Sequence, residues 1–130
     1  MRYREALIPK TKGQLRDNIS DAMLRAPRRQ FPDWEDLEGT FFSMECGVAN
    51  LRARLGDAKA DQLLEMLNCA KAHYEAGDNS LGGALMEDTK MILMDRQPWA
   101  YPKELFRWSA NPWLPEISEV DLCNKDDDEY

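Results

Sequence analysis

The sequence is poor in the residues and motifs from which most catalytic and metal sites are built. Its 130 residues include one histidine and three cysteines, and it contains no P-loop, GxGxxG, HExxH or GxSxG motif. These few residues do not supply a nucleophile, a general base and oxyanion donors together. We therefore expect no catalytic residues, no resident metal and no cofactor. An enzyme without a recognisable motif stays an alternative.

Long apolar runs are absent too. No stretch approaches the ~20 apolar residues of a membrane-spanning helix, and Met-Arg-Tyr-Arg-Glu at the start lacks the apolar centre of a secretory signal. Cys46, Cys69 and Cys123 are odd in number and form no CxxC pair, which is typical of reduced cysteines. We predict a cytoplasmic protein that does not bind membranes.

Charge is plentiful and unevenly distributed. The net charge is −7, from 24 acidic and 17 basic residues. Residues 1–30 nonetheless contain eight basic and three acidic side chains, a balance of +5, which leaves −12 for the rest of the chain. Such separation can steer a charged partner, but it is also typical of an ordinary solvated surface. Five residues could contact phosphates as a basic arm: Lys12, Arg16, Arg25, Arg28 and Arg29.

The strongest structural pattern covers residues 33–55. Apolar residues there are spaced alternately by three and four, which places them on one face of an α-helix packed in a bundle. They are Trp34, Leu37, Phe41, Met44, Val48, Leu51 and Leu55. We expect Asp33 to cap the N-terminus of this helix and Gly56 to end it in a left-handed conformation.

Three further helices are predicted, over residues 11–26, 57–76 and 79–97. Thr11 is expected to cap the first, with Gln14 reaching back to the cap. Short connections between the later helices favour antiparallel neighbours. The predicted fold class is therefore all-α, an antiparallel four-helix bundle.

The composition changes after residue 97, where prolines and tryptophans become frequent. We expect residues 98–123 to form a Pro- and Trp-rich strap with a short terminal helix, and residues 124–130 to be a disordered acidic tail. Residues 1–123 would then form a single helical domain. Because apolar residues occur nearly all round the helix predicted over 79–97, either the strap or another subunit should cover it.

The aromatic residues of the strap are candidates for a recognition surface. Tryptophan, tyrosine and arginine dominate the energetic hot spots of protein interfaces. The candidate partner-binding residues are Trp99, Tyr101, Phe106, Arg107, Trp108 and Trp113. Such residues would serve equally well to wrap the bundle, and the two roles are compatible if one face packs and the other stays exposed.

Three smaller features have alternative interpretations. Glu65, Cys69 and His73 share a helix face and could present metal ligands, but with no second histidine we expect His73 to be an ordinary boundary residue. Asp88 could be a buried acid with a shifted pKa, or could pair with an arginine of the first or second helix. The Gly82-Gly83 pair indicates either an anion site or close helix packing, and we favour packing.

By elimination, these features favour a small non-enzymatic protein that binds another protein, as a regulatory subunit, adaptor or inhibitor, or that self-associates. The aromatic residues, the apolar fourth helix and the separated charges support this interpretation. An alternative is a nucleic-acid-associated factor that uses residues 10–29 as its basic arm. The third hypothesis is a small enzyme or metal protein centred on Cys69, His73 and Asp88.

Overall fold

The computed structural model describes residues 1–96, so the predictions for the strap and the acidic tail lie outside the described residues. The described part forms a short 3₁₀ helix and four α-helices. These are η1 (Glu5–Leu7), α1 (Lys12–Arg25), α2 (Leu37–Leu55), α3 (Asp57–Glu75) and α4 (Asn79–Leu93). Residues 1–96 contain no β-strand. The prediction of an all-helical fold with four helices is confirmed for this part of the chain.

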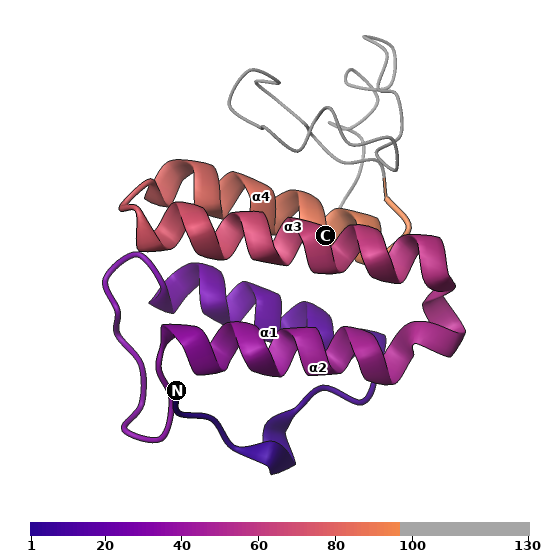
Figure 1. The fold of residues 1–130 in the computed structure, drawn as a ribbon, viewed down its shortest axis with the longest axis horizontal. Coiled ribbons are helices and arrows are strands. Elements are labelled where there is room, and N and C mark those ends of the chain that lie inside the picture. The colour runs from indigo at the N-terminus through magenta and orange to yellow at the C-terminus, as the bar shows by residue number, and fades with distance from the viewer. Residues whose placement is uncertain (97–130) are drawn as a thin grey trace, which may run out of the picture.

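The four α-helices lie side by side, and consecutive helices run in opposite directions (Figure 1). The main contacts of α1 are with α2 and α4, and those of α3 are also with α2 and α4. The core between them is largely aliphatic, and burial of this apolar surface is the main source of stability. Its fully buried members include Leu15, Ile19, Phe41, Met44, Val48, Leu51, Leu63, Leu67, Leu85 and Met86.

The helix α2 begins at Leu37, and the predicted start at Asp33 is wrong. Asp36 is the N-cap: its backbone is extended, and its carboxylate accepts a hydrogen bond from the backbone N–H of Gly39 at 2.7 Å. The four residues before Leu37 instead form a turn and an extended step, in which the backbone N–H of Glu35 donates to the carbonyl of Pro32 at 3.0 Å.

This later start removes Trp34 from the apolar face of α2, where the sequence pattern placed it. The central part of that pattern is correct, because Phe41, Met44, Val48 and Leu51 are all buried. Leu37 and Leu55, at the two ends of α2, are partly buried and pack against the same core.

Three helices end in the same left-handed motif. In this motif one residue after the helix has a positive φ. That residue is Arg29 after α1 (φ 54°), Gly77 after α3 (φ 86°) and Asp95 after α4 (φ 59°). In each case the next N–H bonds to a carbonyl five residues earlier: Gln30 to Arg25, Asp78 to His73, and Arg96 to Met91. A Cβ is strained at positive φ, so glycine is the usual residue here. Two of these three positions are nevertheless not glycine.

The left-handed Asp95 ends α4 at Leu93, so the prediction of a helix to residue 97 is wrong. Its carboxylate accepts hydrogen bonds from Lys59 of α3 and, at 3.2 Å, from Lys12 of α1. The hydrogen bonds from Lys59 and Lys12 hold the pKa of Asp95 below its ordinary value. The residue that ends α4 therefore also joins α4 to two other helices.

The start of α1 agrees closely with the prediction. The side-chain oxygen of Thr11 accepts a hydrogen bond from the N–H of Gln14 at 3.1 Å. The side chain of Gln14 reaches back one residue further than expected and accepts from the N–H of Lys10 at 2.8 Å. At the other end α1 stops at Arg25, and Ala26 keeps helical dihedral angles although Pro27 follows it.

Residues 1–10, here called the N-terminal segment, lie along α2 (Figure 1). Two glycines of α2 make room for it. A Cβ on Gly39 would lie 1.7 Å from the carbonyl oxygen of Arg2, and a Cβ on Gly47 would lie 3.0 Å from Pro9. Between these points the rings of Tyr3 and Phe42 pack with their centroids 4.9 Å apart.

The glycine pair of α4 allows close packing against α3. A Cβ on Gly82 would lie 3.0 Å from the ring of Tyr74, and one on Gly83 would lie 3.7 Å from the Tyr74 hydroxyl. Tyr74 is 1% exposed, and burial raises its pKa to about 12. The favoured packing interpretation of these glycines is therefore confirmed.

The helix α4 is buried on more than its core side. Thr89 is fully buried, and Met91, two residues away and so ~200° round the helix, is only 1% exposed. Asp88 is also 1% exposed. The two faces of α4 are therefore both enclosed.

Candidate functional site

A polar groove lies between the N-terminal segment and α1. It has a volume of about 540 Å³ and extends over Trp34 and Glu35 to the first turns of α2. Pockets for small apolar ligands are lined mainly by hydrophobic side chains. This groove, which we call the α1 groove, has a mixed lining. Beside the apolar residues Ala6, Leu7, Ile8 and Trp34 it has three basic and three acidic residues: Arg4, Lys10, Arg25, Asp17, Asp21 and Glu35.

The turn that precedes α2 supplies one part of the lining. It presents the ring of Trp34 to Arg4, whose guanidinium carbon lies 4.7 Å from the ring centroid in a cation–π contact. It also presents Glu35, whose Oε1 lies 3.3 Å from Nη1 of Arg25. Glu35 is 8% exposed, so its charge needs this partner.

The helix α1 supplies the opposite border. Gln14, Asp17, Asp21 and Arg25 recur at spacings of three and four, which places them on one polar face. Asp17 is paired with Arg16 at 3.2 Å. Asp21 is exposed and makes no ion pair within residues 1–96. Lys10, in the N-terminal segment across the groove, is also exposed, and its side chain makes no ion pair within residues 1–96.

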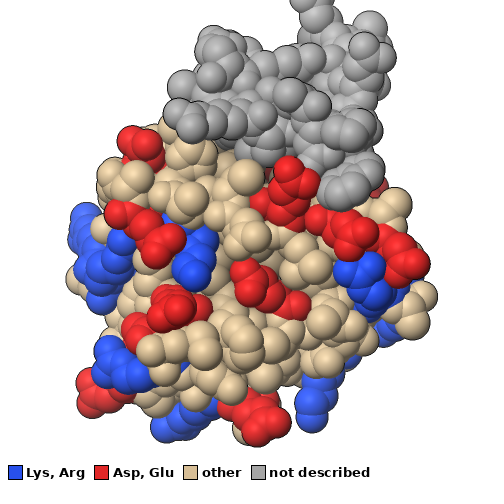
Figure 2. Space-filling view, in the orientation of Figure 1, with Lys and Arg blue, Asp and Glu red and all other residues tan. Residues whose placement is uncertain are grey.

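The predicted basic arm does not form one continuous patch. Lys12 is bound to Asp95, Arg16 to Asp17, and Arg25 to Glu35. Arg29 donates to two backbone carbonyls, and Arg28 is exposed. Acidic and basic groups are also intermixed over the face drawn in Figure 2. Four of the five basic side chains therefore already have intramolecular partners.

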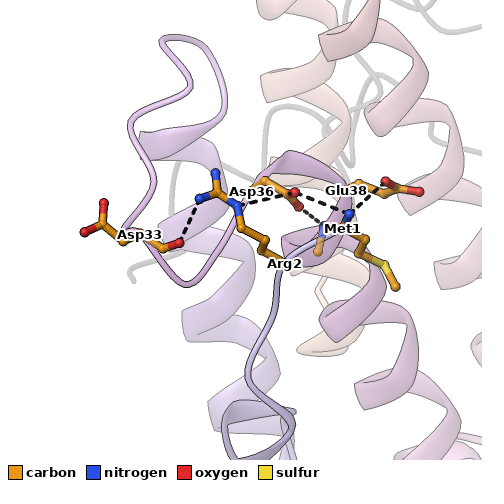
Figure 3. A network of polar contacts seen from close by, with 6 residues as sticks. Met1, Arg2, Asp33, Asp36 and Glu38 are labelled. Carbon is orange, nitrogen blue, oxygen red and sulfur yellow. Dashed lines mark hydrogen bonds and ion pairs between the residues drawn. The ribbon is translucent and has the colours of Figure 1, made fainter.

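A second group of charges surrounds the N-terminus of α2 (Figure 3). The amino group of Met1 lies 3.7 Å from Asp36 and 3.8 Å from Glu38, and Arg2 donates to the carbonyl of Asp33 at 2.8 Å. A backbone hydrogen bond from Arg2 is the largest influence that lowers the pKa of Asp36. The Gly39 N–H and the nearby positive charges act in the same direction, and burial opposes them.

The described cysteines have the properties of structural residues. Burial raises the pKa of the Cys69 thiol, and the neighbouring Glu65 adds to this effect. Burial and Glu45 raise the pKa of Cys46 in the same way. A raised pKa disfavours the thiolate, which is the nucleophilic form.

The three residues that were considered as possible metal ligands do not come together. Glu65 is exposed, whereas Cys69 and His73 are partly buried. His73 has its Nδ1 3.9 Å from Asp78. Within residues 1–96 no group of three or more His, Cys, Asp or Glu side chains is placed to hold a metal ion.

The remaining predicted site residues, the aromatic set from Trp99 to Trp113 with Arg107, lie outside the described residues. Of the helices that the structure describes, none has the length and apolar character to cross a membrane.

Comparisons with models of protein families, with curated proteins and with solved structures found no match.

Sequence reasoning missed the α1 groove because its lining comes from three separate segments. The polar spacing of Gln14, Asp17 and Asp21 was visible, but a polar helix face is normally just solvated. Trp34 fitted an apolar helix face, so nothing indicated its contact with Arg4. Only the docking of the N-terminal segment on α2, opposite α1, creates the groove.

Proposed function

We propose that this protein is a non-enzymatic protein-binding module, such as a regulatory subunit, adaptor or inhibitor, and that the α1 groove is its binding surface. The groove itself is the observation that supports this proposal. It is large enough for several residues of a partner, and charged groups from the N-terminal segment, α1 and the turn before α2 border it. Polar lining of this kind favours recognition of another protein over binding of an apolar small molecule.

The aromatic residues over 98–123 remain a second proposed contact region of the same module. We propose that this stretch is a strap that packs on α4. The burial of Met91, on the side of α4 away from its core residues, supports this arrangement. One aromatic face would then be structural and the other available to a partner.

The nucleic-acid alternative has less support from the geometry. Phosphate binding needs basic side chains that are free to reach the backbone of the nucleic acid. Lys12, Arg16 and Arg25 are already in ion pairs, and Arg29 is held by carbonyls. A basic arm would therefore have to break several internal contacts in order to bind.

The test is a pull-down from native lysate with the full-length protein, with and without nuclease, repeated with Asp21→Lys. We expect a stoichiometric protein that survives nuclease and is lost with Asp21→Lys. Glu65→Lys makes the same charge change on an exposed position of α3 and should keep the partner. Capture that depends on nucleic acid would favour the alternative, and capture unaffected by Asp21→Lys would place the binding surface outside the groove.

A further inference from the structure

We infer that the α1 groove binds an extended segment of a partner protein that carries one basic and one acidic side chain three residues apart. This inference rests on the proposed function and specifies the chemistry of the partner. It depends on which charged side chains of the groove already contact another group of the protein, and on where Asp21 and Lys10, which do not, are placed.

Most charges of the groove are satisfied within the protein. Arg25 pairs with Glu35, Asp17 pairs with Arg16, and Arg4 lies over Trp34. Arg4 has this cation–π contact but no ion pair. The carboxylate of Asp21 and the ammonium of Lys10 have neither kind of contact within the described residues, and both residues are exposed. A partner therefore gains most by presenting a cation to Asp21 and an anion to Lys10.

The shape of the groove favours an extended chain. The lining along α1 runs from Gln14 to Arg25, which is ~16 Å at 1.5 Å per residue and matches about five residues of extended chain. Grooves that receive an amphipathic helix are lined by apolar residues for its anchors at positions i, i+3, i+4 and i+7. In this groove the apolar lining is limited to Ala6, Leu7, Ile8 and Trp34, none of which belongs to α1, and the border along α1 is formed by charged and amide side chains alone.

The positions of Asp21 and Lys10 define a spacing. The backbone N–H of Lys10 bonds to the side chain of Gln14 at 2.8 Å, so Lys10 lies level with Gln14. Asp21 is seven residues further along α1, which is ~10 Å or about three extended residues. Residues three apart in an extended chain point to opposite sides, as is required to reach α1 on one side and the N-terminal segment on the other.

The experiment measures binding of blocked eight-residue peptides of serine and glycine to the full-length protein by NMR titration at low salt. The first two peptides contain Glu and Arg three residues apart, in either order. The control peptides have the same composition with Glu and Arg two residues apart, so that both charges face one side. We expect one of the first two peptides to bind about fivefold more tightly than its control, as expected for one exposed ion pair.

Charge exchange then tests the contact itself. Asp21→Lys should weaken the tighter peptide about fivefold or more, and a peptide with Glu in place of its Arg should recover binding to this variant. Glu65→Lys should leave both affinities unchanged. Equal binding of the two spacings, or no effect of Asp21→Lys, would overturn the inference. If that happens while Asp21→Lys still removes the protein partner in the pull-down, the proposed function holds and only the extended, charge-paired occupant is wrong.

Discussion

The guanidinium of Arg29 joins the C-terminal ends of two helices. Its Nη2 donates to the carbonyl oxygen of Tyr74 in α3 at 2.8 Å, and its Nη1 donates to the carbonyl of Ala26 at the end of α1 at 2.6 Å. Both carbonyls lie at the negative ends of their helices, where a cation is favoured. These contacts offset the strain of a positive φ at Arg29.

We predict that Arg29→Ala lowers the free energy of unfolding by about 1.5–3 kcal/mol, because it removes hydrogen bonds from a charged donor. Chemical denaturation measures the change. Arg28→Ala is the matched control, since the side chain of this exposed neighbour makes no hydrogen bond or ion pair within the described residues, and its effect should stay within ~0.5 kcal/mol. Equal effects of the two substitutions would contradict the bridging role. A nucleic-acid test should therefore change Arg28 and leave Arg29 intact.

The aliphatic core gives a second prediction. Phe41→Ala or Leu51→Ala should each destabilise the protein by about 2–5 kcal/mol, because truncation of a buried side chain loses apolar contact and leaves a cavity. Leu24 on α1 is 77% exposed, so Leu24→Ala should change stability by less than ~0.5 kcal/mol. A loss below ~1 kcal/mol at Phe41 and Leu51 would show that the core is not centred on α2.

Gly39 controls the docking of the N-terminal segment. A Cβ at this position would meet the Arg2 carbonyl at 1.7 Å, so Gly39→Ala should detach the residues around Arg2. Hydrogen exchange should then show loss of protection at the Asp36 N–H, which donates to that carbonyl. Gly13→Ala is the control: its Cβ would meet nothing closer than 3.9 Å, and the helix should gain about 0.5–1 kcal/mol. An unchanged Asp36 N–H in Gly39→Ala would contradict the prediction.

Asp36 should make stability depend on pH. Its pKa is lowered in the folded state, so the charged form stabilises the protein above the unfolded pKa of ~3.9, and this contribution is lost as the pH falls through the folded pKa. Asparagine caps helices about as well but carries no charge. Asp36→Asn should therefore be less stable than the natural chain by about 0.3–1 kcal/mol at neutral pH, the range for a charge at a helix N-terminus.

The two proteins should converge in stability below the folded pKa of Asp36. Urea unfolding at a series of pH values measures this convergence. Asp33→Asn is the control, because Asp33 engages Arg2 through its backbone carbonyl and not through its carboxylate. If the difference in free energy of unfolding between the natural protein and Asp36→Asn stays constant with pH, the electrostatic explanation is excluded.

The helices and much of the core could be predicted because apolar spacing is a local property of the sequence. Phe41, Met44, Val48 and Leu51 were recognisable for this reason. The start of α2 was not, since Asp33 and Asp36 are both good caps by composition. Their roles are decided by Arg2, whose carbonyl accepts the Asp36 N–H from more than thirty residues away in sequence.

The end of α4 was missed, and the left-handed residue after α1 was not predicted, for a related reason. Sequence rules look for glycine at a left-handed position, as at Gly77. Arg29 and Asp95 adopt the same conformation because their side chains bind other helices. Only the tertiary structure contains that information, and the same limit applies to the α1 groove.

Gly56 is the one residue between Leu55 and Asp57, and its φ of 87° reverses the chain without a loop. The entropy lost on closing the α2–α3 hairpin is therefore minimal, whereas the contact of α1 with α4 encloses more than fifty residues of intervening chain. Contacts between neighbours in sequence form earliest in folding. We therefore expect α2 and α3 to associate first, and α1 and α4 to complete the bundle by packing onto that hairpin.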